Sequence, residues 1–351
     1  MVPAANPGAL RFLLGLPHIR RGPILERARA LGCPVLLSAN AFSRWRTAPG
    51  GWREWLGWDL RDLANLAGIP AHLDSAGFVA MMKYRGWEWS VEKYIQLAAA
   101  YPWQWFAAMD LCCEPEIADK RDQVRDRIAG TIALFNECRR DAQRAGIADR
   151  LLPVMQGQHP DDYIYCMDRF PVAAWPSLIG VGSMCRRPVN GAASLLAVVD
   201  AIDRALGTDP VKLHLFGVKT TGAEALRGHP RVATTDSQAY GSAARWDAVK
   251  AGISKTDDFV AQVMGEWHQR QENRLAQPGF AFQPSLAFDV PAEQAPRSLF
   301  AEAEQQIRAE LRELVEAGEV EWNYLFYVAG MEEMVGERYQ ELLAEQSQVA
   351  A

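Results

Sequence analysis

The chain has 351 residues, of which 49% are hydrophobic and 23% charged, and its formal net charge at pH 7 is −6. No stretch approaches the ~18 uninterrupted apolar residues of a membrane-spanning helix, so we expect no contact with a membrane core. Six cysteines without a C-x-x-C pair exclude a disulfide-rich scaffold. The first residues lack the basic and apolar regions of a secretory signal, and we expect a cytoplasmic protein.

Short apolar segments alternate with longer amphipathic ones along most of the chain. The short ones predict strands at 10–16, 33–39, 71–74, 105–110, 151–156, 177–182, 211–217 and 231–236. The longer ones include predicted helices at 22–31, 90–100, 120–145, 192–206 and 221–227. Strands that are apolar throughout are buried on both faces, as in a parallel sheet covered by helices. Eight strand–helix units therefore predict an α/β fold, a (β/α)8 TIM-like barrel, with a doubly wound open sheet as the alternative.

Two segments of the chain are additional to what a minimal (β/α)8 barrel requires. The segment 40–70 is long and rich in tryptophan. Beyond residue 252 the alternation stops, and helical stripes appear from Phe259 to Trp267 and from Phe300 to Leu314. We therefore expect a catalytic barrel at 1–252 and a C-terminal helical extension at 253–351, which packs against the barrel or against a partner. A proline-containing connector at 277–297 separates the two stripes.

Charge is distributed unevenly. Residues 291–351 contain thirteen glutamates and four arginines, so the rest of the chain carries a net charge of about +3. A mildly basic body is compatible with a local phosphate-binding face, and an ordinary solvated surface is the alternative interpretation.

Polar residues or glycines end six of the predicted strands. In a barrel these strand ends meet at one opening, where barrel enzymes place their chemistry. Three carboxylates, one amide and two glycines would then converge. For any one of them, a helix N-cap or a loop turn is the alternative. The six residues are Asp74, Asp110, Gln156, Gly182, Gly217 and Asp236.

The sequences around these positions carry a family resemblance. In chain order they are Asp74-Ser75-Ala76-Gly77-Phe78, Val154-Met155-Gln156-Gly157, Ile179-Gly180-Val181-Gly182, Leu215-Phe216-Gly217-Val218 and Thr234-Thr235-Asp236-Ser237. This order resembles the tRNA-guanine transglycosylase superfamily, whose members carry Asp-Ser-Gly-Gly-Phe/Tyr-Gln, Val-Gln-Gly-Gly, Ile-Gly-Gly, Met-Gly-Val-Gly and a late Phe-Asp. The resemblance covers roughly residues 10–250. It is most like the DpdA branch, which inserts 7-deazaguanines into DNA.

The chain departs from the tRNA enzymes at several of these positions. Alanine replaces a motif glycine at Ala76, and Val79, Gln158 and Val181 also differ from the pattern. The tRNA enzymes carry a structural zinc on a Cys-x-Cys-x-x-Cys…His module, but here no cysteine follows Cys185. That tetrahedral site cannot be built. We therefore expect no zinc and no other cofactor, and the DNA-modifying branch is favoured over the tRNA enzymes.

The resemblance implies a pentosyltransferase that exchanges a base at the same C1′ with retention. Asp236 would be the nucleophile, forming a covalent deoxyribosyl–aspartate, and Asp74 would protonate the departing guanine and deprotonate the incoming base. Asp110 would accept hydrogen bonds from the guanine N1–H and N2–H₂, and Gln156 would donate to the carbonyl oxygen. The other expected base-binding residues are Ser75, Phe78, Gly180, Val181, Gly182, Phe216 and Gly217, with the two phenylalanines sandwiching the base or packing in the core.

Two further kinds of chemically capable residue are assigned to packing. Cys112 and Cys113 are adjacent, and neighbouring residues of a strand point to opposite faces, so shared metal ligation is awkward. His72 alternates with Asp74 on one strand and is interpreted as a structural residue, although it could share the face of Asp74.

The expected partners are DNA and a free 7-deazaguanine base such as preQ0 (7-cyano-7-deazaguanine). Because a duplex hides the glycosidic carbon, the target guanine must be flipped or single-stranded. A helicase-like partner and an oligomer stay open, as do two alternatives: a zinc-free RNA guanine transglycosylase and an inactive barrel that binds nucleic acid. The expected phosphate contacts are Arg186, Arg187, Lys83, Arg85 and Arg245, with Arg44, Arg46 and Lys219 as further candidates.

Overall fold

The computed structural model describes residues 10–48, 51, 53–277, 298–326 and 328–349. Its main sheet is parallel, with strand order β7-β6-β5-β2-β1-β11-β10-β9-β8. The strands are β1 (Arg11–Leu16), β2 (Val35–Ser38), β5 (Ala71–Asp74), β6 (Phe106–Ala107), β7 (Leu151–Leu152), β8 (Val154–Met155), β9 (Leu178–Val181), β10 (Lys212–Leu215) and β11 (Val232–Ser237).

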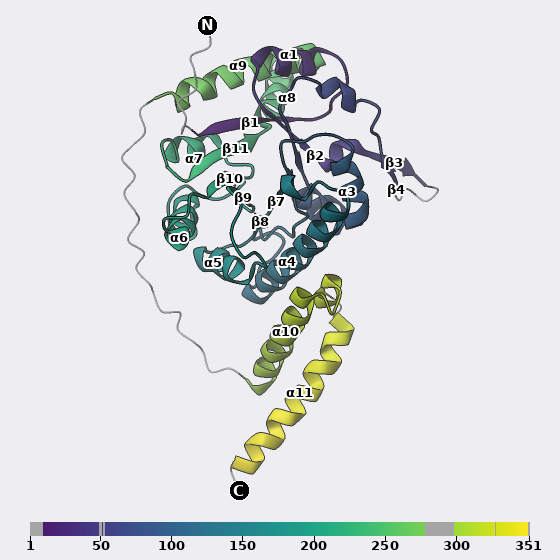
Figure 1. Ribbon diagram of the computed structural model, residues 1–351, viewed down its shortest axis with the longest axis vertical. Helices are drawn as coiled ribbons and strands as arrows, with labels where there is room; N and C mark the ends of the chain where they lie inside the picture. The colour runs from purple at the N-terminus through teal and green to yellow at the C-terminus, as the bar shows by residue number, and fades with distance from the viewer. Residues whose placement is uncertain (1–9, 49–50, 52, 278–297, 327, 350–351) are drawn as a thin grey trace.

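The two edge strands of this sheet, β7 and β8, are consecutive in the chain and separated only by Pro153. Proline has no N–H to donate to a ladder, so the strand is interrupted there. The ladder continues on both sides nevertheless, because the N–H of Ala108 donates to the carbonyl of Leu152 (2.9 Å) and the N–H of Gly180 to that of Pro153 (2.8 Å). The β7–β8 segment therefore joins the two edges, and the strands ring a common centre with helices outside them (Figure 1). The predicted TIM-like α/β fold is confirmed.

The helices around the barrel follow their strands in chain order. Those predicted from the sequence appear within a few residues of the expected bounds, and α5 and α8 complete the ring. The sequence pattern hides α8 because Trp246 and Val249 are exposed on it and break any apolar stripe. The helices are α1 (Pro23–Leu31), α3 (Val91–Ala99), α4 (Arg121–Arg144), α5 (Pro160–Arg169), α6 (Leu195–Leu206), α7 (Thr220–Ala225) and α8 (Ala239–Ala251).

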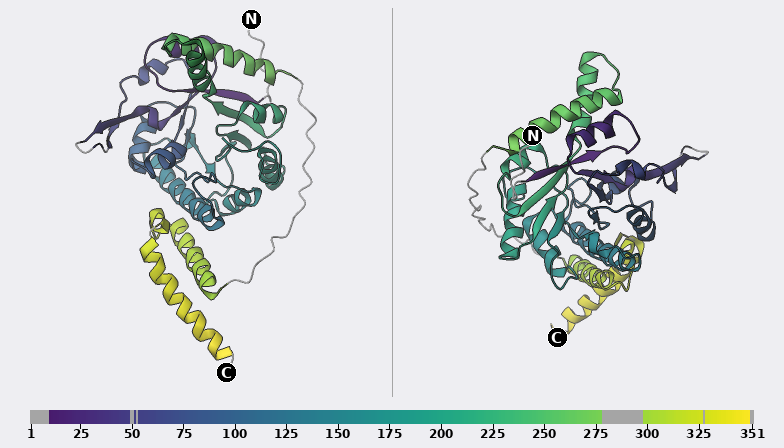
Figure 2. Two further views of the ribbon diagram at one scale, coloured as in Figure 1. Left: turned by 180° about the vertical axis from the view of Figure 1, so that it is seen from behind. Right: turned by 45° about the horizontal axis from the view of Figure 1, so that its top comes forward.

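The tryptophan-rich insertion forms an antiparallel hairpin of β3 (Ser43–Thr47) and β4 (Arg53–Trp58). The hairpin projects from the barrel beside β2 and α3 (Figure 2). At its base, Trp55 and Trp58 pack with Trp89, and the ring centroids are 4.9–6.0 Å apart. These tryptophans therefore anchor the hairpin to the barrel.

The C-terminal helices pack against the barrel at two separate places. α9 (Asp257–Leu275) packs on α1 and α8. α10 (Leu299–Ala317) and α11 (Val328–Val349) lie side by side, and α10 packs on α4 (Figure 1). Most of the predicted connector, 278–297, lies outside the described residues, and the predicted domain boundary at residue 252 stays a prediction.

An ionic contact joins α10 to the barrel. The buried carboxylate of Asp126 on α4 accepts hydrogen bonds from Arg308 (2.6 Å) and Arg312 (2.7 Å) of α10. Arg169 of α5 also donates to both carboxylate oxygens of Glu316, at 3.0 and 2.8 Å. Within the described part of the chain, no helix has both the length and the apolar character needed to cross a bilayer.

Candidate active site

The carboxyl ends of the main-sheet strands and the loops after them form one opening, the barrel mouth. Asp74 is the last residue of β5, Asp236 lies at the end of β11, and Asp110 follows β6. The three carboxylates act on one another: the negative charges of Asp110 and Asp236 both raise the pKa of Asp74. The structure therefore brings together three acidic residues that the sequence placed at separate strand ends.

Asp110 is held by a chain of polar side chains beneath the mouth. The hydroxyl of Ser75 donates to its Oδ1 (2.8 Å), and the amide Nε2 of Gln156 donates to its Oδ2 (2.5 Å). The hydroxyl of Ser183 in turn donates to Gln156 Oε1 (2.7 Å), which determines how the amide is oriented. Burial raises the pKa of Asp110 to about 6, although the bonds from Ser75 and Gln156 oppose that rise. A carboxylate with both oxygens anchored is a preorganised acceptor.

Three motif glycines allow this close packing. A Cβ atom at Gly77 would lie 2.8 Å from Asp110 Oδ1, and one at Gly182 would lie 2.1 Å from Gln156 Nε2. A Cβ at Gly180 would lie 2.8 Å from the ring of Phe216. Real Cβ atoms do not approach so closely, so each glycine makes room for one side chain of the mouth.

Val181 occupies a glycine position of the superfamily pattern. Its side chain is fully buried in the core cluster between the sheet and the helices. The side chain therefore faces the helices, and only the backbone of Val181 is placed to meet a ligand at the mouth.

Asp74 combines a raised pKa with partial access to solvent. Its Oδ2 accepts a hydrogen bond from the N–H of Ala76 (3.0 Å). Burial, followed by the charges of Asp110 and Asp236, raises the pKa of Asp74 to about 7. Ala76 itself has φ of 73°, a left-handed conformation that favours glycine, at a position where the superfamily pattern has glycine. A carboxyl group that titrates near neutral pH suits general acid–base chemistry.

Asp236 has a different environment. Its Oδ1 accepts a hydrogen bond from the N–H of Gly217 (2.8 Å), at the end of the neighbouring strand β10. Gly217 has φ of 67°, a left-handed conformation that favours glycine. The side chain of Asp236 is 19% exposed, and Nε2 of His214 lies 3.6 Å from the same Oδ1. Asp236 is therefore accessible and has a donor from the backbone.

The floor beneath these carboxylates is aromatic. Trp105 lies inside the barrel between His72 and His214, with ring centroids 4.7 and 4.9 Å away, and Phe216 packs edge-on against His214 at 4.5 Å. His72 does face the barrel interior, where its Nδ1 lies 3.0 Å from the carbonyl of Val35. His214 belongs to none of the sequence motifs, although its spacing of two residues from Phe216 places both on one face of the strand.

The two expected base-stacking residues lie at the mouth and are partly buried. Phe216 is supported by Gly180 and His214, whereas Phe78 follows Asp74 on the short helix α2 (Gly77–Val79). The guanidinium of Arg186 lies 5.7 Å from the centroid of the Phe78 ring. Their stacking on a base stays a prediction.

The adjacent cations Arg186 and Arg187 differ in their surroundings. Arg186 is exposed and pairs with Glu116 (2.8 Å). Arg187 points inward: its guanidinium donates to the carbonyls of Gly157 and Ser183, and to further oxygens of the same loops. These bonds engage the donors that a phosphate would need, so the structure places Arg187 as a support for the loops of the mouth rather than at the phosphate surface.

The remaining predicted phosphate contacts are dispersed. Lys83 and Arg85 are exposed on the segment after Asp74, close to the hairpin, because Trp45 of the hairpin stacks on Tyr84 at 4.6 Å. Lys219 is the N-cap residue before α7, beside the mouth, whereas Arg245 lies midway along α8, on the outside of the barrel. On the hairpin, Arg44 and Arg46 are exposed, and Arg46 pairs with Glu54.

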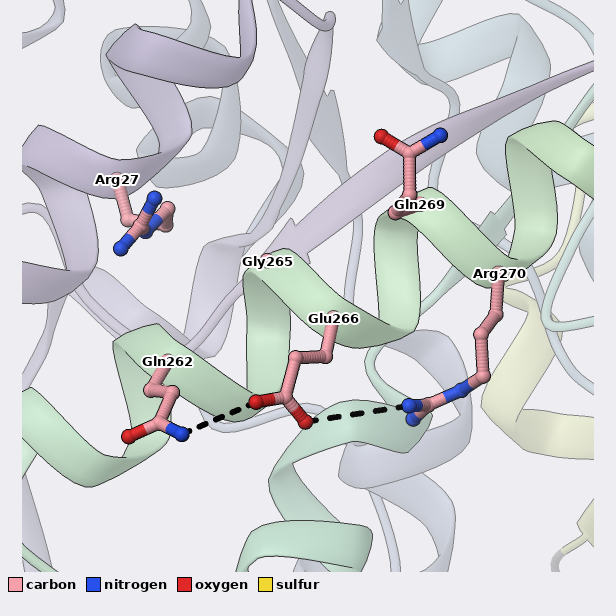
Figure 3. A pocket seen from close by; sticks show the side chains of 6 residues that line it. All are labelled: Arg27, Gln262, Gly265, Glu266, Gln269 and Arg270. Atoms are coloured by element: carbon pink, nitrogen blue, oxygen red, sulfur yellow. Dashed lines mark hydrogen bonds and ion pairs between the residues drawn. The ribbon is translucent and has the colours of Figure 1, made fainter.

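Other candidate sites do not involve the mouth. Cys112 and Cys113 are buried, and burial raises the pKa of both thiols. Among the described residues, no three His, Cys, Asp or Glu side chains are grouped as a metal ion would require. A surface hollow of about 600 Å³ lies between α1 and α9, lined by polar residues such as Arg27 and Glu266, away from the mouth (Figure 3).

The sequence matches the model of a known protein family. A family model described as "DpdA: DeoxyPurine in DNA protein A" matches residues 28–287, well over half of the chain. The matched range includes every residue of the barrel mouth named above and extends through α9. No curated protein matches the chain.

Proposed function

Because the chain belongs to the DpdA family, we propose that it is a cytoplasmic DNA guanine transglycosylase. As a pentosyltransferase, it would replace guanine in DNA with a 7-deazaguanine such as preQ0 through a covalent aspartyl–deoxyribose intermediate. The observation that carries this proposal is the pairing of two carboxyl groups with contrasting environments at one mouth. Asp74 has a pKa raised to about 7, whereas Asp236 is accessible and receives a backbone N–H.

The first displacement removes guanine. A carboxylate oxygen of Asp236 attacks C1′, the C1′–N9 bond breaks, and its electron pair goes to the departing guanine. The carboxyl proton of Asp74 neutralises that charge, which leaves Asp74 as a carboxylate. A pKa near 7 supports this role because a substantial fraction of Asp74 is then protonated at neutral pH.

The second displacement inserts the new base. Asp74, now ionised, takes the proton from N9 of the 7-deazaguanine, whose freed electron pair attacks C1′. The bond between C1′ and Asp236 breaks, and the electron pair returns to the carboxylate. Two inversions at C1′ give net retention, by the logic of retaining glycosidases.

Guanine recognition centres on Asp110. Each of its oxygens already accepts one hydrogen bond, from Ser75 or from Gln156, and each retains a further lone pair. The two free lone pairs suit the adjacent N1–H and N2–H₂ donors of guanine or a 7-deazaguanine. The second N–H of the Gln156 amide would meet the carbonyl oxygen. Stacking on Phe78 and Phe216 would contribute roughly 1–3 kcal/mol for each base contact.

The nucleic acid would approach across the mouth beside the hairpin. Arg186 at the mouth, Lys83 and Arg85 after Asp74, and Arg44 and Arg46 on the hairpin are exposed cations on that side. We propose that they contact phosphates of a strand whose target guanine is flipped or unpaired, because C1′ is inaccessible within a duplex. A helicase-like partner would meet the same need for an open strand.

Trapping the covalent intermediate tests this function. The enzyme is incubated with guanine-containing single-stranded DNA, duplex DNA or tRNA, with and without preQ0, and the products are separated by denaturing electrophoresis. We expect an adduct with DNA alone, which disappears in Asp236→Ala. An adduct with tRNA alone would favour the RNA enzyme, and DNA binding without any adduct or base exchange would favour the inactive binding subunit.

A further inference from the structure

His214 lies directly beneath the proposed nucleophile. It belongs to β10, its side chain is fully buried, and its ring is enclosed by Trp105 and Phe216. Its Nε2 lies 3.6 Å from Oδ1 of Asp236. No group in the described part of the chain hydrogen-bonds to this buried nitrogen, although buried polar atoms are nearly always paired.

The other ring nitrogen indicates which tautomer is present. Nδ1 of His214 lies 2.8 Å from the hydroxyl oxygen of Thr234, which can donate its proton to the ring. Nδ1 is then the acceptor, and the ring proton is on Nε2, facing the carboxylate of Asp236. The opposite tautomer would direct a nitrogen lone pair at a carboxylate oxygen, which is electrostatically unfavourable.

We propose that His214 is a positioning residue for Asp236, and that its Nε2–H becomes a second donor to Oδ1 when DNA is bound. This inference rests on the proposed function. The present separation is longer than a hydrogen bond, but active-site hydrogen bonds commonly shorten in the substrate complex. With the N–H of Gly217 and Nε2–H of His214 both on Oδ1, Oδ2 is left as the attacking oxygen.

The same pair of donors would act in both chemical steps. In the first step they orient Asp236, so that Oδ2 forms the bond to C1′ while the C1′–N9 bond breaks. In the second step the bond between Oδ2 and C1′ breaks, and negative charge returns to the carboxylate. Donors already aimed at Oδ1 stabilise that developing charge without reorganisation, as in an oxyanion hole.

His214 also connects the proposed nucleophile, Asp236, with Phe216. Phe216, expected to stack on the base, packs edge-on against the imidazole at 4.5 Å. The ring can therefore neither tilt nor withdraw without disturbing Phe216 or Trp105. His72 lies on the other side of Trp105 from His214, and because burial lowers the pKa of His72 to about 4, it is neutral near pH 7.

Three substitutions distinguish a positioning role of His214 from a role in packing alone. His214→Phe retains an aromatic ring but removes the donor, and His214→Gln places an amide N–H near the position of Nε2. His72→Phe is the matched control, because His72 also packs on Trp105 but lies on β5, where its Nδ1 faces the carbonyl of Val35. Each variant is measured for guanine exchange into DNA, for kcat and KM separately, and for thermal unfolding.

We expect His214→Phe to lower kcat at least 10-fold, and up to ~100-fold, with KM for DNA and for the incoming base changed less than about twofold. His214→Gln should recover most of the loss, and His72→Phe should retain kcat within about threefold. Equal losses in the two phenylalanine variants, or no recovery by glutamine, would overturn the positioning role.

Two further variants keep the result interpretable. If His214→Phe does not fold, Thr234→Val tests the same idea by removing the partner of Nδ1, and we expect a fall in kcat of about 5- to 10-fold; unchanged kcat would reject the inference. Failure of the proposed function is recognised separately, because the unmodified enzyme would then exchange no base. If Asp236→Ala abolishes exchange and His214→Phe does not affect it, only the role of His214 is rejected.

Discussion

The amide of Gln156 donates to the carboxylate of Asp110 across 2.5 Å, at a point where the two residues follow β8 and β6. This bond aligns the base-recognition carboxylate before any ligand arrives. Asp110 is only 8% exposed, so few other groups compete for its remaining lone pairs.

Asp110→Asn tests whether this carboxylate reads the base. An amide replaces one acceptor oxygen by a donor, which then opposes a donor of guanine. Sites built around such hydrogen bonds reject mismatched partners strongly. We expect kcat/KM for the incoming base to fall by about 10²- to 10⁴-fold, mostly through KM, in steady-state exchange assays. A variant with unchanged KM for the base would exclude Asp110 from recognition.

The pKa of Asp74 predicts how activity depends on pH. Removal of guanine needs the protonated form, and the pKa is raised to about 7, so kcat/KM for DNA should decrease as pH rises through about 7. In Asp74→Asn this limb should disappear together with most of the exchange activity. The measurement is the rate of release of labelled guanine from DNA between pH 5 and 9, with Asp236→Ala as the inactive control.

The raised pKa of Asp74 also predicts how the stability of the fold depends on pH. A folded-state pKa of about 7, above the ordinary aspartate value of 3.8, means that ionisation of Asp74 destabilises the fold. The stabilising contribution of protonated Asp74 is fully present below about pH 4 and is lost as the pH rises through about 7. Asp74→Asn avoids this loss, so its melting temperature relative to the unmodified chain should increase between pH 5 and pH 8. A difference that is constant across this range would contradict the raised pKa.

Gly182 offers a steric test of the recognition geometry. A methyl group there would lie 2.1 Å from Gln156 Nε2, so Gly182→Ala must displace the amide that holds Asp110. We expect a stability loss of roughly 1–3 kcal/mol in urea unfolding, together with a higher KM for the base. Gly86→Ala is the matched control, since a Cβ at Gly86 meets nothing within 4 Å. The geometry described here is wrong if both variants behave alike.

Arg186 and Arg187 should differ although they are neighbours. Arg186 is exposed, so Arg186→Ala should weaken DNA binding and reduce the slope of log K against log salt by about 0.9 for one lost phosphate contact. Arg187→Ala should leave that slope unchanged and lower the unfolding midpoint, because several loop carbonyls lose their donor. Fluorescence anisotropy over a range of salt concentrations, with thermal unfolding in parallel, distinguishes these outcomes.

The sequence alone was informative about strands and strand ends. Continuous apolar segments indicate burial on both faces, as in a parallel sheet covered by helices, and the carboxyl ends of parallel strands meet on one side. The convergence of Asp74, Asp110, Gln156 and Asp236 was therefore predictable without coordinates. Glycines 77, 180 and 182 were recognised from their motifs, although the side chains that need their space were not.

The tertiary structure determined which polar groups are already hydrogen-bonded within the protein and which are exposed. Arg187 and Arg186 are indistinguishable in the sequence, yet one is engaged by loop carbonyls and the other is exposed. His214 gives no local signal, because its importance depends on Asp236, which lies on the neighbouring strand. Such pairings join residues far apart in the chain, and their geometry depends on barrel stagger and closure through Pro153, which no local pattern encodes.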